Sequence, residues 1–566
     1  MTAEQLTPVR LEGQAKQIID TGRTRLLVTA AVFAVAFLAV SVRLADVTLM
    51  SEAEEPHITQ AAPATNVTTS RADIRDRNGM LLATNLATAS LYANPHVVIN
   101  ADDAAAKLAR ALPDLSEPAL AQKLKSDRGF VWIRRHLTPR QQYEVNRLGI
   151  PGVDFQRDER RVYPLGALAA HVIGMTDVDN KGLAGVERYF DEEIRSRSEP
   201  LYLSIDARVQ SIAAAELQHA MTTFKAIGAA GLVLDVRTGE IIAMVSLPSF
   251  DPNDPGASPT DARFNRTVLG VYEMGSTFKI FTTAMALDAG ISSMSSTYDA
   301  SHPIQIARFT IRDYHAKNRW LSVPEIFIYS SNIGAARMAM EVGGTAQKAF
   351  LGKLGLLQPV PVELSEVGTP LVPQVWREIN TMTIGFGHGL AVSPLHLAAG
   401  VAAIVNGGIY HTPTLLRRDR ATPPDGRRVV STKTSRELRR LMLEVVEAGT
   451  GKMAHADGYL IGGKTGTAEK AAGHHYRQKA LLSSFIGAFP INDPRYLVLA
   501  MLDEPQGTKE TMNYATGGWV AAPIVANIVK RSAPILGIAP IDETAPDIRR
   551  DMLVQVDYRE GARAPR

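Results

Sequence analysis

A long apolar run occupies residues 26–42, where only Thr29 and Ser41 interrupt the apolar side chains. Its length is close to the lower limit for a helix that spans a membrane. Basic residues precede the run, whereas residues 45–70 carry acidic residues and no lysine or arginine. Because basic flanks stay in the cytoplasm, the pattern predicts a cytoplasmic N-terminus over 1–25, a transmembrane anchor over 26–44 and export of the remaining chain.

A cleaved signal peptide is the alternative interpretation of this run. Ala39 and Ser41 are small residues at the interval that cleavage sites show. The apolar core of a signal peptide is shorter, however, and the basic region before it is brief. The pattern therefore favours an uncleaved anchor.

The first exported region begins after a segment with almost no large apolar side chains, so we expect a linker over 45–70 and a folded region over 71–200. Within that region Asn78-Gly79 separates two apolar stretches, which predicts a hairpin turn. Helical patterns follow at 104–112 and 138–148, the second with Thr138 as N-cap and Pro139 in the first turn.

A larger region follows over 201–538. Apolar runs at 231–235, 240–245, 481–489 and 496–502 are separated in pairs by short turns, which predicts antiparallel strands. Helical stretches at 280–287, 333–342 and 394–404 lie between the two pairs. The order predicts an α+β fold in which helices are inserted into an antiparallel sheet. Residues 539–566 alternate charges and prolines, and we expect a disordered tail there.

Composition excludes several classes of protein. The chain has 566 residues, 61 Lys+Arg against 58 Asp+Glu, and a net charge of +3, which does not fit a strongly basic nucleic-acid binder. Hydrophobic residues make up 45%, enough for folded domains. The chain has no cysteine, so thiol catalysis, disulfides and cysteine-ligated metal sites are excluded.

Residues 458–465 match the pattern of a phosphate-binding loop, G-x-x-x-x-G-K-[ST]. Such a loop must follow a strand and open a helix. Here residues 459–461 are themselves typical of a strand, and Gly466 stands where the helix would begin. We therefore expect no nucleotide site at Lys464.

A second chemistry is suggested by Ser276 and Lys279, which are three residues apart at the start of a helical pattern. A neutral amine near a serine hydroxyl can take its proton and so produce a nucleophile. The S-x-x-K pattern alone is common by chance, and a capping serine with a surface lysine is the simpler interpretation. Two further patterns follow in order, Ser330-Ser331-Asn332 and Lys464-Thr465-Gly466. This ordered trio is the signature of penicillin-binding proteins and serine β-lactamases.

The roles expected from the chemistry are distinct. Ser276 attacks, Lys279 takes the proton, Ser330 passes it on, and Asn332 holds a substrate amide. Lys464 attracts a substrate carboxylate, and Gly466 leaves room for an acyl chain beside the strand.

The chain resembles the class B high-molecular-weight penicillin-binding proteins, and among them the septal members most closely. The resemblance is carried by residues 71–79, 161–164, 174–177, 182–187, 235–244, 249–253, 272–279 and 385–389. It implies a pedestal domain over 71–200 and a transpeptidase domain over 201–538. It also implies that Lys464, Thr465 and Thr467 bind a carboxylate and that the backbone amides of Ser276 and Thr467 form an oxyanion hole. Met274 and Ala72 depart from the residues that many relatives carry, without removing a catalytic atom.

The function implied by the resemblance is cross-linking of peptidoglycan stem peptides through a Ser276 acyl-enzyme in the septum, with acylation by β-lactams. It implies no metal and no organic cofactor. Expected partners are stem peptides, the lipid-linked precursor, the membrane, a multi-pass glycan polymerase and other division proteins, with no nucleic acid. The expected location is the bacterial inner membrane, with the catalytic domain in the periplasm. A β-lactam-sensing receptor, a side-wall transpeptidase and a non-catalytic scaffold are the alternatives.

Overall fold

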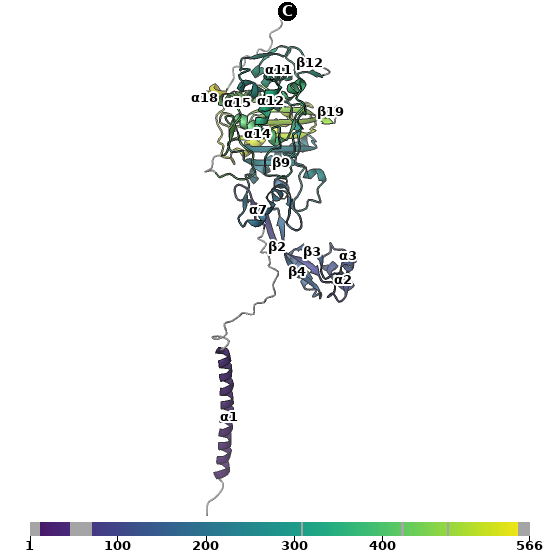
Figure 1. Ribbon diagram of the computed structural model, residues 1–566, viewed down its shortest axis with the longest axis vertical. Helices are drawn as coiled ribbons and strands as arrows, with labels where there is room; N and C mark the ends of the chain where they lie inside the picture. The colour runs from purple at the N-terminus through teal and green to yellow at the C-terminus, as the bar shows by residue number, and fades with distance from the viewer. Residues whose placement is uncertain (1–11, 46–70, 307–308, 420–423, 473–474, 553–566) are drawn as a thin grey trace, which may run out of the picture. The chain divides into compact units, whose positions relative to one another are not determined.

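The computed structural model describes residues 12–45, 71–306, 309–419, 424–472 and 475–552. Within these residues, the N-terminal unit contains one helix, α1 (Glu12–Ala45) (Figure 1). Its segment Arg23–Val42, 20 residues with a mean hydropathy of 2.3, is long and apolar enough to cross a membrane. The helix starts well before the predicted anchor. Residues 1–11 of the predicted cytoplasmic segment and residues 46–70 of the predicted linker lie outside the described residues.

The second unit, residues 69–566, opens with the predicted hairpin. β1 (Ile74–Arg75) pairs antiparallel with β2 (Leu81–Ala93), and Gly79 takes a φ of +92° in the turn between them. β2 also pairs with β3 (Val131–Leu137) and β4 (Val153–Val162), and β1 runs parallel to β7 (Leu201–Tyr202). The turn contacts the next region, because Asn78 Nδ2 donates to Asp206 Oδ2 at 2.9 Å.

Three helices pack beside β2 and β3 around a small apolar core of their own: α2 (Ala101–Ala111), α3 (Glu117–Leu124) and α4 (Pro139–Asn146) (Figure 1). The predicted cap of α4 is confirmed. Thr138 Oγ1 accepts from the backbone N–H of Gln141, and the Gln141 side chain accepts in return from the backbone N–H of Thr138.

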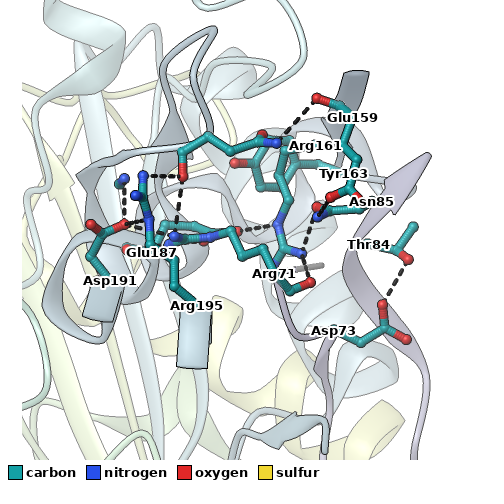
Figure 2. A network of polar contacts seen from close by, with 12 residues as sticks. Arg71, Asp73, Thr84, Asn85, Glu159, Arg161, Tyr163, Glu187, Asp191 and Arg195 are labelled. Atoms are coloured by element: carbon teal, nitrogen blue, oxygen red, sulfur yellow. Dashed lines mark hydrogen bonds and ion pairs between the residues drawn. The ribbon is translucent and has the colours of Figure 1, made fainter. Parts of the chain in front are cut away.

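Short elements complete this region, and a buried ion network holds them together. They are a 3-10 turn at Gly166–Ala169, α5 (Ala170–Ile173), β5 (Met175–Thr176), β6 (Gly182–Ala184), α6 (Gly185–Tyr189) and α7 (Asp191–Ser196). Glu187 in α6 accepts from Arg71 Nε at 2.6 Å and from Arg161 Nε at 2.7 Å (Figure 2). Arg71, Arg161 and Glu187 are all buried, whereas the half-buried Arg77 pairs with Glu240 of the larger region.

The larger region is built on a five-stranded antiparallel sheet in the order β18-β19-β20-β8-β9. Its strands are β8 (Gly228–Asp235), β9 (Ile241–Leu247), β18 (Gly462–Ala472), β19 (His475–Phe489) and β20 (Tyr496–Asp503). Helices α8 (Ala207–Thr223) and α17 (Ala522–Ser532) cover one face, and α14 (Pro394–Val405) and α15 (Thr432–Glu447) pack on the other. The predicted α+β fold is therefore confirmed.

β20 shows why these strands are continuously apolar rather than alternating. Val498 and Ala500 point to the core shared with α8 and α17, whereas Leu499 and Met501 point to the core on the opposite face. Successive side chains of a strand point to opposite faces, so a sheet covered on both faces needs apolar residues at every position.

The remaining elements lie around the sheet, and α16 and the 3-10 turn Lys452–Ala454 add Val520 and Ala454 to the core shared with α8 and α17. The helices are α9 (Lys279–Asp288), α10 (Val323–Ile328), α11 (Asn332–Val342), α12 (Gly344–Lys353), α13 (Glu378–Ile384) and α16 (Gly517–Val520), with 3-10 turns at Thr260–Arg263, Gly275–Phe278 and Lys452–Ala454. The strand pairs are β10 (Tyr272–Glu273) with β15 (Ala391–Val392), β11 (Thr297–Asp299) with β14 (Trp320–Ser322), β12 (Ile304–Ile306) with β13 (Phe309–Ile311), and β16 (Ile409–Tyr410) with β17 (Arg427–Arg428).

The start of the predicted disordered tail is ordered instead. Ile541 N donates to Gly458 O at 2.9 Å, and α18 (Pro546–Met552) follows, with the Met552 side chain buried in the core beside α15. The few apolar residues of this charged segment find a surface to pack on, which composition alone does not reveal. Residues 553–566 of the predicted tail lie outside the described residues.

Candidate active site

Ser276 lies in the 3-10 turn Gly275–Phe278 that leads into α9. Gly275 takes a φ of +55°, and a Cβ atom there would lie 2.6 Å from the carbonyl oxygen of Thr467. Gly275 N also donates to Gly387 O at 3.1 Å. The turn therefore packs directly against β18, which brings Ser276 next to the strand that carries Lys464.

Lys279 begins α9 and is fully buried. Its Nζ lies 2.9 Å from Ser276 Oγ, 2.8 Å from Ser330 O, 2.8 Å from Asn332 Oδ1 and 3.1 Å from Ser330 Oγ. The Ser330 carbonyl and the Asn332 amide oxygen can only accept. A neutral amine has two hydrogens, and these two oxygens account for both, which leaves the nitrogen lone pair for the hydroxyl of Ser276.

Ser330 lies in the short loop between α10 and α11 with a φ of +61°, a conformation that is uncommon for a residue with a Cβ atom. Its hydroxyl lies between two amines, because Lys464 Nζ donates to Ser330 Oγ at 3.0 Å and Lys279 Nζ lies on the other side. A hydroxyl that is both donor and acceptor can pass a proton between such groups.

Lys464 lies inside β18, paired with Ile486 of β19, and is fully buried. The chain continues after Lys464 as β18, whereas a phosphate-binding loop would open a helix at this point. Thr465 Oγ1 lies 2.7 Å from Thr450 Oγ1, and Thr467 Oγ1 accepts from Gly517 N at 3.1 Å.

Gly466 is closely packed on the side to which a side chain would point. A Cβ atom there would lie 2.4 Å from Ser484 Oγ, 2.8 Å from Met274 O and 2.9 Å from Thr277 Cγ2. The space into which a side chain at this position would point is thus filled by the turn that carries Ser276 and by the neighbouring strand. Glycine is needed here so that the turn carrying Ser276 can approach β18.

Burial lowers the pKa of Lys279 well below its usual value, and the positive charge of Lys464 lowers it further. Burial alone lowers the pKa of Lys464 to about 7. His388 follows Gly387 at the same turn, and burial together with the Lys279 charge lowers its pKa to about 4. Its imidazole is therefore neutral near pH 7, which agrees with a structural or cleft-lining histidine and not with a proton carrier.

The structure brings together Ser276, Lys279, Ser330, Asn332 and Lys464, and it places Thr465, Gly466 and Thr467 along the same strand. Sequence reasoning missed Asp313, whose carboxylate contacts the loop that carries Ser330. No motif signalled it, because the contact depends on how the chain returns after β13. Among the described residues, the one group of three possible metal ligands, Glu447, His455 and Glu543, contains none of these site residues.

Two family descriptions match the chain. "Penicillin binding protein transpeptidase domain" matches residues 229–530, and "Penicillin-binding Protein dimerisation domain" matches residues 66–220. The second match covers the region of the Arg71–Glu187 network.

Individual proteins are similar over most of the chain. The probable peptidoglycan D,D-transpeptidase FtsI of Caulobacter vibrioides is 42% identical over 533 residues, 92% of this chain and 90% of the relative. The peptidoglycan D,D-transpeptidase FtsI of Escherichia coli is 31% identical over 515 residues, 85% of this chain and 86% of the relative.

The crystal structure of a peptidoglycan synthetase from Bifidobacterium adolescentis shares the fold, with a TM-score of 0.67 and 20% identity over 85% of this chain and 98% of that one. With both domains matched and FtsI proteins similar along nearly their whole length, the chain belongs to the penicillin-binding protein transpeptidase family, in its class B, FtsI-like group.

Proposed function

We propose that this protein is a peptidoglycan D,D-transpeptidase of septal cell-wall synthesis that works through an acyl-enzyme at Ser276. The observation that carries the proposal is the 2.9 Å contact between Lys279 Nζ and Ser276 Oγ, in a site where burial and Lys464 favour the neutral amine. The family match and the names of the FtsI relatives support the same reaction.

The first half of the reaction forms the acyl-enzyme. Lys279 takes the proton of Ser276 as Oγ attacks the carbonyl carbon of the D-Ala–D-Ala bond. The carbon–nitrogen bond breaks, and the leaving amine of D-Ala receives a proton through Ser330, whose hydroxyl lies between the two lysines. In the second half an acceptor amine attacks the ester and loses a proton, and Ser276 regains its own.

The binding roles follow from the charges and donors of β18. Lys464, Thr465 and Thr467 would hold the substrate carboxylate, and the amides of Ser276 and Thr467 would stabilise the oxyanion. Asn332 orients Lys279 through Oδ1. Its Nδ2 donates to Arg312 O at 2.9 Å, so holding a substrate amide would require it to leave that carbonyl.

We extend the proposal to the arrangement of the chain. A pedestal over 71–200 and a transpeptidase domain over 201–538 agree with the two family matches within a few tens of residues. In the part of the chain that the structure describes, one helix is long and apolar enough to span a membrane, which supports a single-pass membrane protein. Basic residues before that helix favour a cytoplasmic N-terminus in the inner membrane and a periplasmic catalytic domain.

The reaction is tested by incubating the full-length protein in detergent with a stem-peptide donor and an amine acceptor, with Ser276→Ala as control. We expect a cross-linked dimer that the variant does not form. Acylation by a fluorescent penicillin without any dimer would replace the proposal with a β-lactam-sensing receptor. Rescue of a division-blocked cell by Ser276→Ala would indicate a scaffold, and rescue of elongation instead of division would indicate a side-wall enzyme.

A multi-pass glycan polymerase, supplied with the lipid-linked precursor, is the expected membrane partner. The α1 segment offers small residues such as Ala30, Ala31 and Ala34, which let another helix approach closely. Replacing residues 26–42 by an unrelated span should keep penicillin labelling and export but reduce co-purification of the polymerase. If cells that carry the replaced span divide normally, residues 26–42 serve only as a membrane anchor.

A further inference from the structure

Asp313 lies in the segment between β13 and β14 and contacts the loop before α11 through both carboxylate oxygens. Its Oδ2 accepts from Ser331 Oγ at 2.7 Å, and its Oδ1 accepts from the backbone N–H of Ile333 at 2.9 Å. The preceding residue adds a third contact, because Arg312 O accepts from Asn332 Nδ2. The segment thus holds three consecutive residues of the loop and helix start that follow Ser330.

These contacts bear on a conformation that the local sequence does not favour. Ser330 has a φ of +61°, a conformation that is unfavourable for a residue with a Cβ atom unless its surroundings impose it. Ser331 Oγ also accepts from Gly334 N at 3.0 Å and so caps α11. Asp313 fixes this cap from outside the helix, and the cap fixes the direction in which Ser330 and Asn332 point.

Both atoms oriented in this way face Lys279. Ser330 O and Asn332 Oδ1, each 2.8 Å from Nζ, are the two acceptors that aim the lone pair of Lys279 at Ser276. The titratable groups that face Lys279 are Lys464 from β18, His388 from the turn after α13, and Asp313 itself. Asp313 is the one carboxylate among them.

We propose that Asp313 is a positioning residue for acylation: by clamping Ser331 and the first turn of α11, it holds Ser330 and Asn332 where they orient Lys279 toward Ser276. The inference rests on the proposed function. Asp313 need not touch the substrate, because its effect reaches the reacting atoms through the loop.

The test is the rate of acylation of the full-length protein in detergent by a fluorescent penicillin, with the maximal rate separated from the half-saturating concentration. The variants are Asp313→Ala, which removes both contacts, and Asp313→Asn, which keeps an acceptor for Ile333 N. The matched control is Asp288→Ala. Asp288 clamps α15 in the same way, accepting from Ser431 N at 2.7 Å and Thr434 Oγ1 at 2.9 Å.

We expect the maximal rate of Asp313→Ala to fall about 10- to 100-fold, as for a small displacement of a catalytic group. The half-saturating concentration should change little, Asp313→Asn should lie between, and Asp288→Ala should label like the wild type. A second readout separates positioning from stability. The Asp313 charge raises the pKa of Lys279, so its loss in Asp313→Asn should move the acid limb of the rate profile to lower pH.

The inference would be overturned if Asp313→Ala and Asp313→Asn had the maximal acylation rate of the wild type. It would also be overturned if Asp288→Ala lowered the maximal acylation rate as much as the Asp313 variants do. If Asp313→Ala does not fold, Asp313→Asn decides by the same two readouts. A failure of the proposed function would give a different result: the wild type would not be labelled by penicillin, or Ser276→Ala would be labelled as strongly as the wild type.

Discussion

Replacing Glu187 by glutamine should loosen the region around α6 far more than its small change in volume suggests. Glu187 is the only carboxylate that contacts both Arg71 and Arg161 among the described residues, and the three side chains are 2% exposed or less (Figure 2). The variant keeps one acceptor oxygen but turns an NH₂ group toward the other guanidinium. Two buried cations then remain, with Asp191, 21% exposed, as the nearest carboxylate to Arg71.

The expected cost follows from this geometry. Removing one partner of a buried ion pair destabilises a protein by about 3–5 kcal/mol, because the remaining charge stays desolvated. Glu193→Gln is the matched control. Glu193 pairs with Arg197 at 2.7 Å, but the two side chains are 52% and 32% exposed, and such a helical surface pair contributes about 0.3–0.5 kcal/mol.

The assay is amide hydrogen exchange of the full-length protein in detergent, followed at β1 and α6. A loss of about 3 kcal/mol raises the population of the open state, and with it the exchange rate, by about 100-fold, since 1.4 kcal/mol is tenfold. Penicillin labelling should be unchanged, because none of the three network residues contacts Lys279. If Glu187→Gln exchanges no faster than Glu193→Gln, the network does not stabilise this region and the reasoning from burial is refuted.

Three further predictions concern the site. Lys279→Arg should lower penicillin acylation about 100-fold or more, because a guanidinium stays protonated and cannot act as the base; near-normal labelling of folded protein would contradict that role. The labelling rate should rise as the pH passes the lowered pKa of Lys279, since the base is active when neutral. It should reach its plateau at a pH well below about 10.4, the pKa of free lysine. A rate that still increases at about pH 10 would refute the effect of burial on this pKa. Gly387→Ala should slow labelling, because its Cβ atom would lie 1.9 Å from Gly275 O beside the nucleophile. The control is Gly407→Ala, because Gly407 has a φ of +96° against +92° for Gly387 but nothing lies within 4 Å of its Cβ position. This control should lose stability without labelling more slowly. Equal labelling rates for the two variants would show that the clash at Gly387 is harmless.

Short-range patterns carried much of the fold in advance. Asn78-Gly79 predicted the turn between β1 and β2, Thr138 and Pro139 predicted the start of α4, and the apolar run at 26–42 predicted a membrane-spanning length of helix. Each signal lies within a few residues and reports a local preference: a positive φ, a free backbone N–H, or a length without charge. Such preferences need no knowledge of distant chain segments.

The chemistry could be expected from three separated patterns because their residue types and order are specific together. What they could not supply is the environment of each side chain. The geometry that would let Lys279 act as a base depends on Ser330 and Asn332, which accept its two hydrogens, and on the nearby Lys464. The close packing at Gly466 was hidden for the same reason, since the atoms that crowd it come from the segment around Ser276 and from β19.

By itself, the sequence determined the order of the elements, the apolar helix, the antiparallel sheet and the residue types of the reaction. The tertiary structure alone decided that Arg71 and Glu187 are buried, that Asp313 contacts the Ser330 loop, and that α18 packs where a disordered tail was expected. These features join residues from separate segments, 116 positions apart for Arg71 and Glu187. Burial and pairing are properties of the surroundings, and the surroundings of a side chain exist only once the chain has folded.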